Sequence, residues 1–286
     1  MSAVADLPLT RPVDRGLARS RRRPRSATDA GAPVAALATA STVTVLSVVV
    51  LLPIAALLAA GVGPGFLATV TQPEAVAALE FTVGVSLVAV VIDLIAGLVV
   101  AWVLVRDDFP GRRVVDALVD LPFALPTVVA GLTLLALYGE GNPLGLDLAY
   151  TRAGVALALL FVTLPFVVRS VQPVLADLDP EVEEAAATLG AGPWTTFRRV
   201  LLPALVPALV TGGAQAFARA LGEFGSVVLI SGNLPYRTEV ASWWIFTQVE
   251  NGAPEAGAAV AVVLLAVALV VVVVLRLAGR RAEGRR

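Results

Sequence analysis

A run without a single charged side chain extends from residue 34 to residue 60. It exceeds the roughly 20 apolar residues that a helix needs to cross a bilayer. Because residues 1–33 precede it, we do not expect a cleaved signal peptide, whose apolar core is shorter and lies nearer the start. The sequence therefore predicts an all-α integral membrane protein with six transmembrane helices joined by loops. The other five apolar stretches cover about 79–105, 114–138, 153–170, 203–231 and 256–276.

The arginines predict how these spans are oriented. If the N-terminus is cytoplasmic, inside segments hold 18 of the 21 basic residues, and the outside loops hold only Arg152 and Arg237. Since cytoplasmic loops carry the excess of positive charge, we expect both termini in the cytoplasm. We expect the basic arm 1–33 to be disordered and to contact anionic lipid rather than nucleic acid. Residues 277–286 form a second basic tail.

The composition excludes several kinds of chemistry. The chain has no cysteine and no histidine, and all of its basic residues are arginines. It therefore lacks a thiolate or imidazole nucleophile and the usual zinc ligands. It also lacks the lysine that a phosphate-binding P-loop requires. We expect no catalytic residue, no metal and no cofactor in this chain.

The longest predicted inside loop contains a helical hairpin at 180–201. Asp179 and Pro180 are typical of a helix start, and Gly190 of a helix end. Gly192 and Pro193 turn the chain into a second short helix, with the next span beginning at Pro203. The residues alone leave two interpretations open, a partner-docking surface and an amphipathic loop on the bilayer. The apolar faces of the two helices consist of Val182, Ala185, Ala186 and Leu189, then Trp194, Phe197 and Leu201.

The same segment resembles the motif of bacterial ABC-importer permeases. That motif reads E-A-A, three residues, G, nine residues, an aliphatic, one residue and L-P. It is matched here, with valine where isoleucine is common, by Glu184, Ala185, Ala186, Gly190, Val200, Leu202 and Pro203. The resemblance implies a type I importer permease domain over 77–276, in which the hairpin is the coupling helix that docks on an ATPase subunit.

Four segments carry a narrower resemblance, to the T subunit of sulfate/thiosulfate importers. They are 101–134, 164–175, 218–233 and 237–242. The R-A-L-G-E-F-G part is shared with molybdate and tungstate permeases, whereas 101–134 and 237–242 favour sulfate. The resemblance runs from about residue 79 to the C-terminus. It implies alternating access in a bacterial inner membrane, two copies of an ATPase that uses ATP and magnesium, a homologous W-type permease and an extracytoplasmic sulfate-binding protein.

Asp93 is the first of three charged residues that we single out inside the predicted spans. A charge at the bilayer centre costs at least about 2.5–3.5 kcal/mol. Small residues flank Asp93 at four-residue spacing, so we expect it to face protein rather than lipid. We interpret it as bonded to a neighbouring helix, with a role in transport as the alternative. The small residues are Ala89, Gly97 and Ala101.

The other two charges, Arg219 and Glu223, lie four residues apart in the fifth predicted span and can pair on one helix. Gln215 precedes them by one turn. Two interpretations stay open: a structural ion pair, or a place for Arg219 in the conduit, where its charge lowers the barrier for an anion. A neighbouring stripe predicts a packing seam of Ala214, Ala218, Gly222 and Ser226.

Other functions agree less well with these features. A proton-coupled secondary carrier, with Asp93 and Glu223 as its relay, needs no ATPase dock, and a membrane-embedded enzyme lacks the required side chains. A molybdate or tungstate permease is the alternative within the same family. We interpret the prolines of the spans as kinks rather than sites. They are Pro122, Pro126, Pro165 and Pro207.

Overall fold

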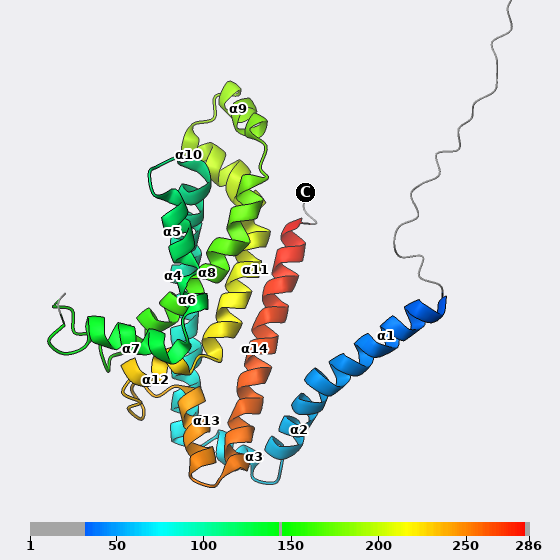
Figure 1. Cartoon of the computed structure of the whole chain (residues 1–286), viewed down its shortest axis with the longest axis vertical. Helices are drawn as coiled ribbons and strands as arrows, with labels where there is room; N and C mark the ends of the chain where they lie inside the picture. The colour runs from blue at the N-terminus through cyan, green and yellow to red at the C-terminus, as the bar shows by residue number, and fades with distance from the viewer. Residues whose placement is uncertain (1–31, 143–144, 284–286) are drawn as a thin grey trace, which may run out of the picture. The chain divides into compact units, whose positions relative to one another are not determined.

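The computed structural model describes residues 32–142 and 145–283, so most of the predicted basic arm and the end of the tail lie outside them. All regular secondary structure of the described residues is helical (Figure 1). In chain order the elements are α1 (Ala32–Leu46), the π-helical segment η1 (Ser47–Leu51), α2 (Leu52–Gly61), α3 (Phe66–Val70), α4 (Pro73–Arg106), α5 (Arg112–Val119), α6 (Leu121–Ala124), α7 (Thr127–Tyr138), α8 (Arg152–Ala176), α9 (Pro180–Thr188), α10 (Pro193–Thr196), the π-helical segment η2 (Phe197–Leu201), α11 (Leu202–Leu221), α12 (Gly225–Ile230), α13 (Ala241–Glu250) and α14 (Pro254–Glu283).

Five helical stretches of the described residues are long and apolar enough to cross a membrane. They are Val34–Gly61, Pro73–Arg106, Arg152–Ala176, Pro193–Leu221 and Pro254–Leu277. Each corresponds to one of the six predicted spans. The predicted all-α membrane fold is confirmed.

The remaining predicted span, 114–138, which is the third in chain order, is not one continuous helix. It is divided into α5, α6 and α7, and α7 is only 12 residues long. Pro126 explains the second break, because a proline disfavours helical geometry at the residue before it. Leu125 is accordingly extended, with φ −86° and ψ 134°.

The predicted span 203–231 also differs from the structure. Helix α11 ends at Leu221, and α12 begins at Gly225 after a short break. At its start, α11 continues from α10 and η2, so the predicted second helix of the hairpin belongs to the span itself. The segments 61–78 and 232–255, expected to be loops, contain the short helices α3 and α13.

Both π-helical segments occur just before a proline. Segment η1 ends two residues before Pro53, and η2 ends two residues before Pro203. A proline inside a helix removes one backbone donor and its ring crowds the carbonyl four residues earlier. A locally wider turn relieves this crowding, so the helix continues past the proline.

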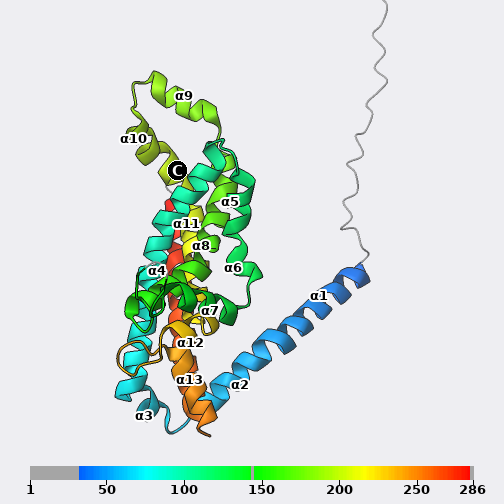
Figure 2. The same ribbon diagram turned by 60° about the vertical axis from the view of Figure 1, so that its left-hand side comes forward.

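The chain divides into two compact units, Met1–Pro53 and Ile54–Arg286. In the first, the described helix exposes large apolar side chains such as Val43, Leu46 and Val49. In the second, the long helices α4, α8, α11 and α14 lie side by side (Figures 1 and 2). Helix α4 packs along α8, and α11 contacts both α8 and α14. Leu104, Val167, Val171, Leu175, Leu205, Phe217 and Leu221 form much of the main core.

Two glycines allow these helices to approach closely. A Cβ at Gly97 of α4 would lie 2.8 Å from Cγ1 of Val167 on α8. A Cβ at Gly212 of α11 would lie 2.9 Å from the Cα of the same valine. Val167 is completely buried between them.

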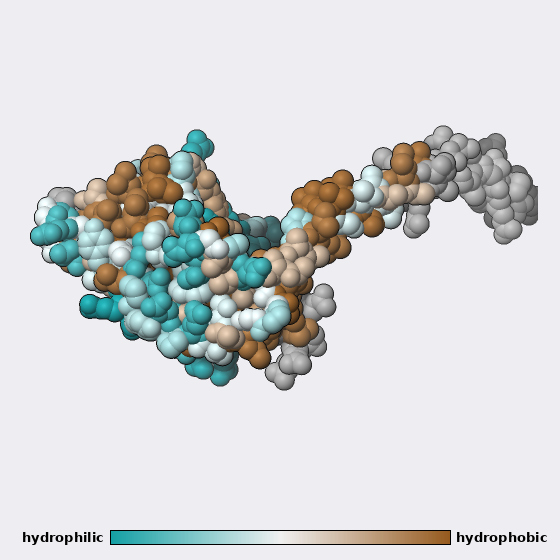
Figure 3. All heavy atoms as spheres, turned by 90° about the horizontal axis from the view of Figure 1, so that it is seen from below, coloured by the Kyte–Doolittle hydropathy of each residue, from teal (hydrophilic) through white to brown (hydrophobic). Residues whose placement is uncertain are grey.

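The second unit has two distinct ends. Helices α9 and α10 lie at the same end as the C-terminus of α14, and α3 and α13 lie at the other (Figures 1 and 2). Figure 3 looks at the α3 and α13 end, where hydrophilic residues cover much of the face and apolar residues gather toward its edges. This is the pattern expected where a membrane protein meets water.

The close contact at Gly97 predicts the effect of a branched side chain there. Gly97→Val should lower the thermal stability of the purified protein in detergent, because overpacking a core costs about 1–3 kcal/mol. Gly84→Val, on the same helix, is the matched control, since a Cβ there meets no heavy atom within 4 Å. Equal melting temperatures for the two variants would contradict this account.

Candidate functional site

The hairpin that follows α8 has well-defined ends. The Asp179 side chain accepts a hydrogen bond from the backbone N–H of Glu181 at 2.9 Å and so caps α9. At the other end Gly190 has φ +83°, the left-handed conformation that the sequence predicts. The N–H of Gly190 donates to the Ala187 carbonyl, and that of Ala191 donates to the Ala186 carbonyl. Together these two bonds form a Schellman motif, which ends the helix sharply.

Much of the apolar surface of the hairpin is uncovered. Leu189 is 88% exposed, Trp194 71% and Val182 49%. Of the motif residues, Glu184, Ala185, Gly190 and Pro203 are exposed, whereas Ala186, Val200 and Leu202 are partly buried. Exposed apolar side chains rimmed by polar ones mark interaction surfaces. The hairpin has the properties of a docking surface.

The base of the hairpin is attached to the end of α4. Arg106 pairs with Glu183, with 2.6 Å between guanidinium nitrogen and carboxylate oxygen. The same guanidinium lies 5.6 Å from the ring centre of Trp102. Trp102 in turn contacts Phe197 edge-on, and Phe197 stacks on Trp194. Glu183 therefore faces inward while its neighbour Glu184 faces outward.

A second polar cluster, not predicted from the sequence, joins α8 to α5. Arg169 donates to both carboxylate oxygens of Asp120, at 2.7 and 2.6 Å. It also donates to a carboxylate oxygen of Asp116 at 2.6 Å. The two aspartates lie inside the predicted span 114–138 at i, i+4 spacing, and this pattern was the signal available in the sequence.

The break that precedes α7 and the break that precedes α12 lie next to each other. Gly225, the first residue of α12, packs against the side chain of Thr127, the first residue of α7, and a Cβ on Gly225 would overlap it. A Cβ at Gly131 would lie 2.6 Å from the Ser226 carbonyl oxygen. These contacts cover part of the interrupted backbone with protein, which is where irregular backbone is tolerated in membranes.

Arg219 and Glu223 lie at this junction. Their predicted ion pair is present, with 2.6 Å between the charged atoms. Arg219 is in the last turn of α11, where the helix dipole favours a cation, and Glu223 follows the helix end. Glu223 is buried. Its carboxylate also accepts a hydrogen bond from the Ser226 backbone N–H and so caps the start of α12. The Arg219 side chain is 35% exposed, and Gln215 is exposed one turn earlier.

The predicted seam of small residues on α11 is wrong. Ala214 and Ser226 are buried, but Ala218 and Gly222 are exposed. The helix ends before Ser226, so the four-residue spacing does not continue along one face. The residues that instead turn toward the core are Gly212, Gly213, Ala216, Phe217 and Ala220.

Asp93 faces the protein interior, as the sequence predicts. It is 1% exposed and accepts a hydrogen bond from the Thr163 hydroxyl of α8. The flanking small residues Ala89, Gly97 and Ala101 are buried too. The structure places Asp93 in the contact between α4 and α8, whereas Arg219, Glu223 and Gln215 share the junction of α11 and α12.

Comparison with known proteins bears on these features. The family model of the binding-protein-dependent transport system inner membrane component matches residues 93–284. This chain belongs to that family. The match includes the hairpin, the Arg169 cluster and the junction of broken helices.

Several curated relatives of this permease are sulfate transport proteins. The probable sulfate transport system permease protein cysT of Nephroselmis olivacea is 50% identical over 206 residues, covering 68% of this chain and 72% of the relative. The sulfate transport system permease protein CysT of Synechococcus elongatus is 51% identical over 197 residues, covering 66% and 70%. That of Escherichia coli strain K12 is 48% identical over 199 residues, covering 67% and 72%.

Solved structures show the same fold at low sequence identity. A bacterial ABC transporter involved in the import of the acidic polysaccharide alginate has a TM-score of 0.72 at 18% identity, over 87% of this chain and 95% of that one. An amino acid ABC transporter, solved with histidines, has a TM-score of 0.55 at 19% identity, over 76% and 98%. The ABC importer permease fold that the hairpin motif predicts is confirmed.

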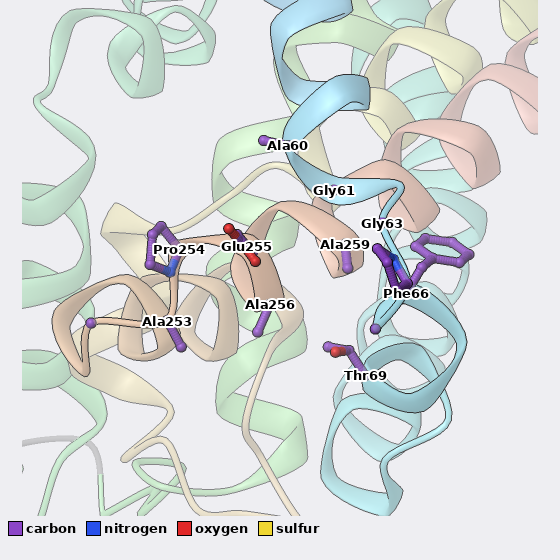
Figure 4. A pocket seen from close by; sticks show the side chains of 13 residues that line it. Ala60, Gly61, Gly63, Phe66, Thr69, Ala253, Pro254, Glu255, Ala256 and Ala259 are labelled. Atoms are coloured by element: carbon purple, nitrogen blue, oxygen red, sulfur yellow. The ribbon is translucent and has the colours of Figure 1, made fainter.

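A cavity of about 550 Å³ opens at the α3 and α13 end of the permease. Figure 4 shows Pro254 and Glu255 of α14 on one side of it and Phe66 and Thr69 of α3 on the other. Glu255 is the one charged residue among its 13 lining residues. Its negative charge makes the cavity unsuitable for an oxyanion. Within the described ranges, no group of three acidic, histidine or cysteine side chains could hold a metal ion.

Glu239 is a buried carboxyl in the connection between α12 and α13. Burial raises the pKa of its carboxyl, and the charge of nearby Glu74 raises it further. Its neighbour Thr238 is buried as well, and the Thr238 hydroxyl donates to the Ser231 carbonyl at 2.6 Å. This connection is therefore ordered by internal bonds, and we assign it to structure.

The geometry of Gly190 predicts how the hairpin responds to a branched residue. Gly190→Val forces a side chain into left-handed backbone, which costs about 1–2 kcal/mol per residue. We expect the protein to insert into the membrane normally. The hairpin should be misaligned, so that an ATPase subunit co-purifies poorly and uptake of the transported solute is lost.

Two controls separate backbone strain from bulk in the Gly190 experiment. Gly192→Val adds the same side chain two residues away, where φ is −73° and a Cβ has open space. Gly190→Asn keeps a residue that tolerates the left-handed region. Both controls should retain ATPase binding. Normal assembly and transport in Gly190→Val would mean that the hairpin is only a surface loop.

Proposed function

We propose that this chain is the permease subunit of an ATP-driven importer of sulfate, and of thiosulfate, that works by alternating access. The observation that carries the proposal is its identity of 48–51% with sulfate transport system permeases over about two thirds of the chain. The matched motif and the exposed hairpin agree with this role. A secondary carrier would have no use for such a docking surface.

In this proposal, ATP hydrolysis in the partner subunits displaces the hairpin. Leu189 and Trp194 supply apolar contacts to a cleft in one of the two ATPase subunits, and Glu184 lies on the exposed acidic face. ATP and magnesium bind the ATPase partners, so the permease itself is not an enzyme. The Schellman end at Gly190 and the Arg106–Glu183 pair hold the docking helix at a defined angle.

A second, W-type permease subunit completes the conduit. Thr211, Gln215 and Ala218 form an exposed face on α11 beside Arg219. A polar or charged side chain facing lipid is costly, so this face needs protein or water beside it. We place the anion path between the two permeases, with Arg219 lowering the barrier for the anion.

The remaining partners follow from the two ends of the second unit. An extracytoplasmic sulfate-binding protein delivers the anion to the hydrophilic α3 and α13 end (Figure 3). The hairpin end is cytoplasmic, as is the C-terminus of α14 beside it (Figure 1). We place the chain in a bacterial inner membrane, with both termini in the cytoplasm as the arginine distribution predicts.

Sulfate uptake tests the proposed function directly. Cells lacking this chain should take up little radiolabelled sulfate, and the restored gene should return uptake to the wild-type rate. Excess unlabelled thiosulfate should compete, while molybdate and tungstate should not. Sulfate uptake that is unchanged by the deletion, or that molybdate blocks first, would contradict the proposal.

The role of Arg219 can be separated from that of its partner by removing both charges. In Arg219→Gln, Glu223→Gln the glutamine keeps an acceptor for the Ser226 N–H, and no carboxylate is left unpaired. We expect normal assembly and normal binding-protein-stimulated ATPase activity. Sulfate uptake should fall about tenfold, equivalent to about 1.4 kcal/mol in the barrier.

The single variants are the controls for this double change. Arg219→Gln alone should assemble poorly, because it leaves a buried carboxylate without its partner. Glu223→Gln alone should assemble and transport nearly normally, because Arg219 remains. Near-normal uptake by the double variant would show that Arg219 serves only as a structural charge.

A further inference from the structure

The Arg169 cluster lies between the hairpin and the broken helix α6–α7. Helix α8, which carries Arg169, ends at Ala176, and α9 begins four residues later at Pro180. Asp120, which precedes α6, lies seven residues before Thr127, where α7 begins. The cluster thus joins α8, which leads to the hairpin, to α5–α6, which lead to the contact between Thr127 and Gly225.

Every N–H of the Arg169 guanidinium is used in this cluster. Besides the three bonds to carboxylate oxygens, it donates to the Asp116 backbone carbonyl at 2.7 Å and to the Gln172 side-chain oxygen at 2.5 Å. Gln172 in turn donates to the Asp116 carboxylate at 3.1 Å. A planar guanidinium that grips two carboxylates has a fixed orientation, which a flexible ammonium group does not have.

Apolar packing of the α5–α6 segment is limited to partly buried contacts: Val119 packs against the main core, and Phe123 meets Phe166 of α8 edge-on with 5.1 Å between ring centres. Neither helix contains a buried residue. Val114 is 62% exposed, Leu118 56% and Phe123 50%. The side chains of Asp116 and Asp120 are about half exposed, so water reaches the ion pairs. The Arg169 guanidinium nevertheless donates five hydrogen bonds within the cluster. The polar cluster therefore supplies the hydrogen bonds that attach this segment to α8, beside the Phe123–Phe166 contact.

We propose that Arg169 is a positioning residue for transport, which makes α8 and α5–α6 move as one body. A displacement of the hairpin by the ATPase then reaches the start of α7, and with it the contact between Thr127 and Gly225. This inference rests on the proposed function, since it needs an ATPase that moves the hairpin. In this proposal, the guanidinium of Arg169 and the carboxylates of Asp116 and Asp120 transmit the motion of the hairpin to the anion path.

Transport per ATP hydrolysed tests this assignment. Arg169→Gln and Arg169→Lys should assemble with the ATPase and keep stimulated ATP hydrolysis in proteoliposomes. Sulfate moved per ATP should fall about two- to thirtyfold, the range for mutations that weaken coupling between sites. Lysine should rescue little, because it cannot grip both carboxylates. Arg112→Gln is the matched control, as it removes an exposed i, i+4 pair with Asp108 on the same segment.

A variant without charged side chains in the cluster tests whether an unpaired charge, rather than the lost grip of Arg169, causes the loss of coupling. Arg169→Gln, Asp116→Asn, Asp120→Asn leaves no carboxylate without its partner, but it also lacks the bidentate grip. It should assemble well and still transport little sulfate per ATP. Normal coupling in this variant would overturn the proposal. Failure of all three Arg169 variants to assemble would assign the cluster to folding and overturn it too.

Spin labels measure the rigid connection itself. The chain has no cysteine, so labels at Thr188→Cys on α9 and Leu132→Cys on α7 are the only ones in this subunit. Both positions are exposed. The distance between them should stay the same when ATP is trapped in the otherwise unchanged complex, and should shift or broaden in Arg169→Gln. An equal distance distribution in both would contradict the proposal. A complex with unchanged Arg169 that moves no sulfate would instead refute the proposed function.

Discussion

The backbone of a membrane protein must satisfy its own hydrogen bonds, because the bilayer core contains no water. Long helices meet this demand in most of the chain. The interruption between α11 and α12 meets it with local partners. Glu223 accepts the Ser226 N–H at the start of α12, and the Ser242 hydroxyl donates to the Glu223 carbonyl. These bonds let the chain change direction beside Arg219.

Close packing supplies the rigid part of the molecule. Gly97 and Gly212 bring α4 and α11 against Val167 of α8, and Asp93 adds a hydrogen bond in the same contact. Outside this packed region, helix α9 buries no residue, and Thr211 and Gln215 of α11 are exposed. In the proposed importer, these two uncovered surfaces contact partner subunits.

Three arginines connect these surfaces through ion pairs. Arg106 holds the hairpin, Arg169 holds the α5–α6 segment, and Arg219 holds the end of α11. Their surroundings differ, since Arg169 donates five hydrogen bonds to Asp116, Asp120 and Gln172, whereas Arg219 pairs with Glu223. We accordingly assign Arg169 to positioning and Arg219 to the anion path.

Patterns along the chain were enough to predict the helical membrane fold, the capped hairpin and the inward position of Asp93. Length, apolarity, helix-end residues and small-residue spacing are local properties that can be read along the chain. Three features emerged only in the folded protein: the breaks in 114–138, the pairing of Glu183 with Arg106, and the bonds from Arg169 to Asp116 and Asp120. The partners in these pairs are 49 to 77 residues apart. Their meeting depends on how helices pack across the bundle, and no pattern along one segment specifies that.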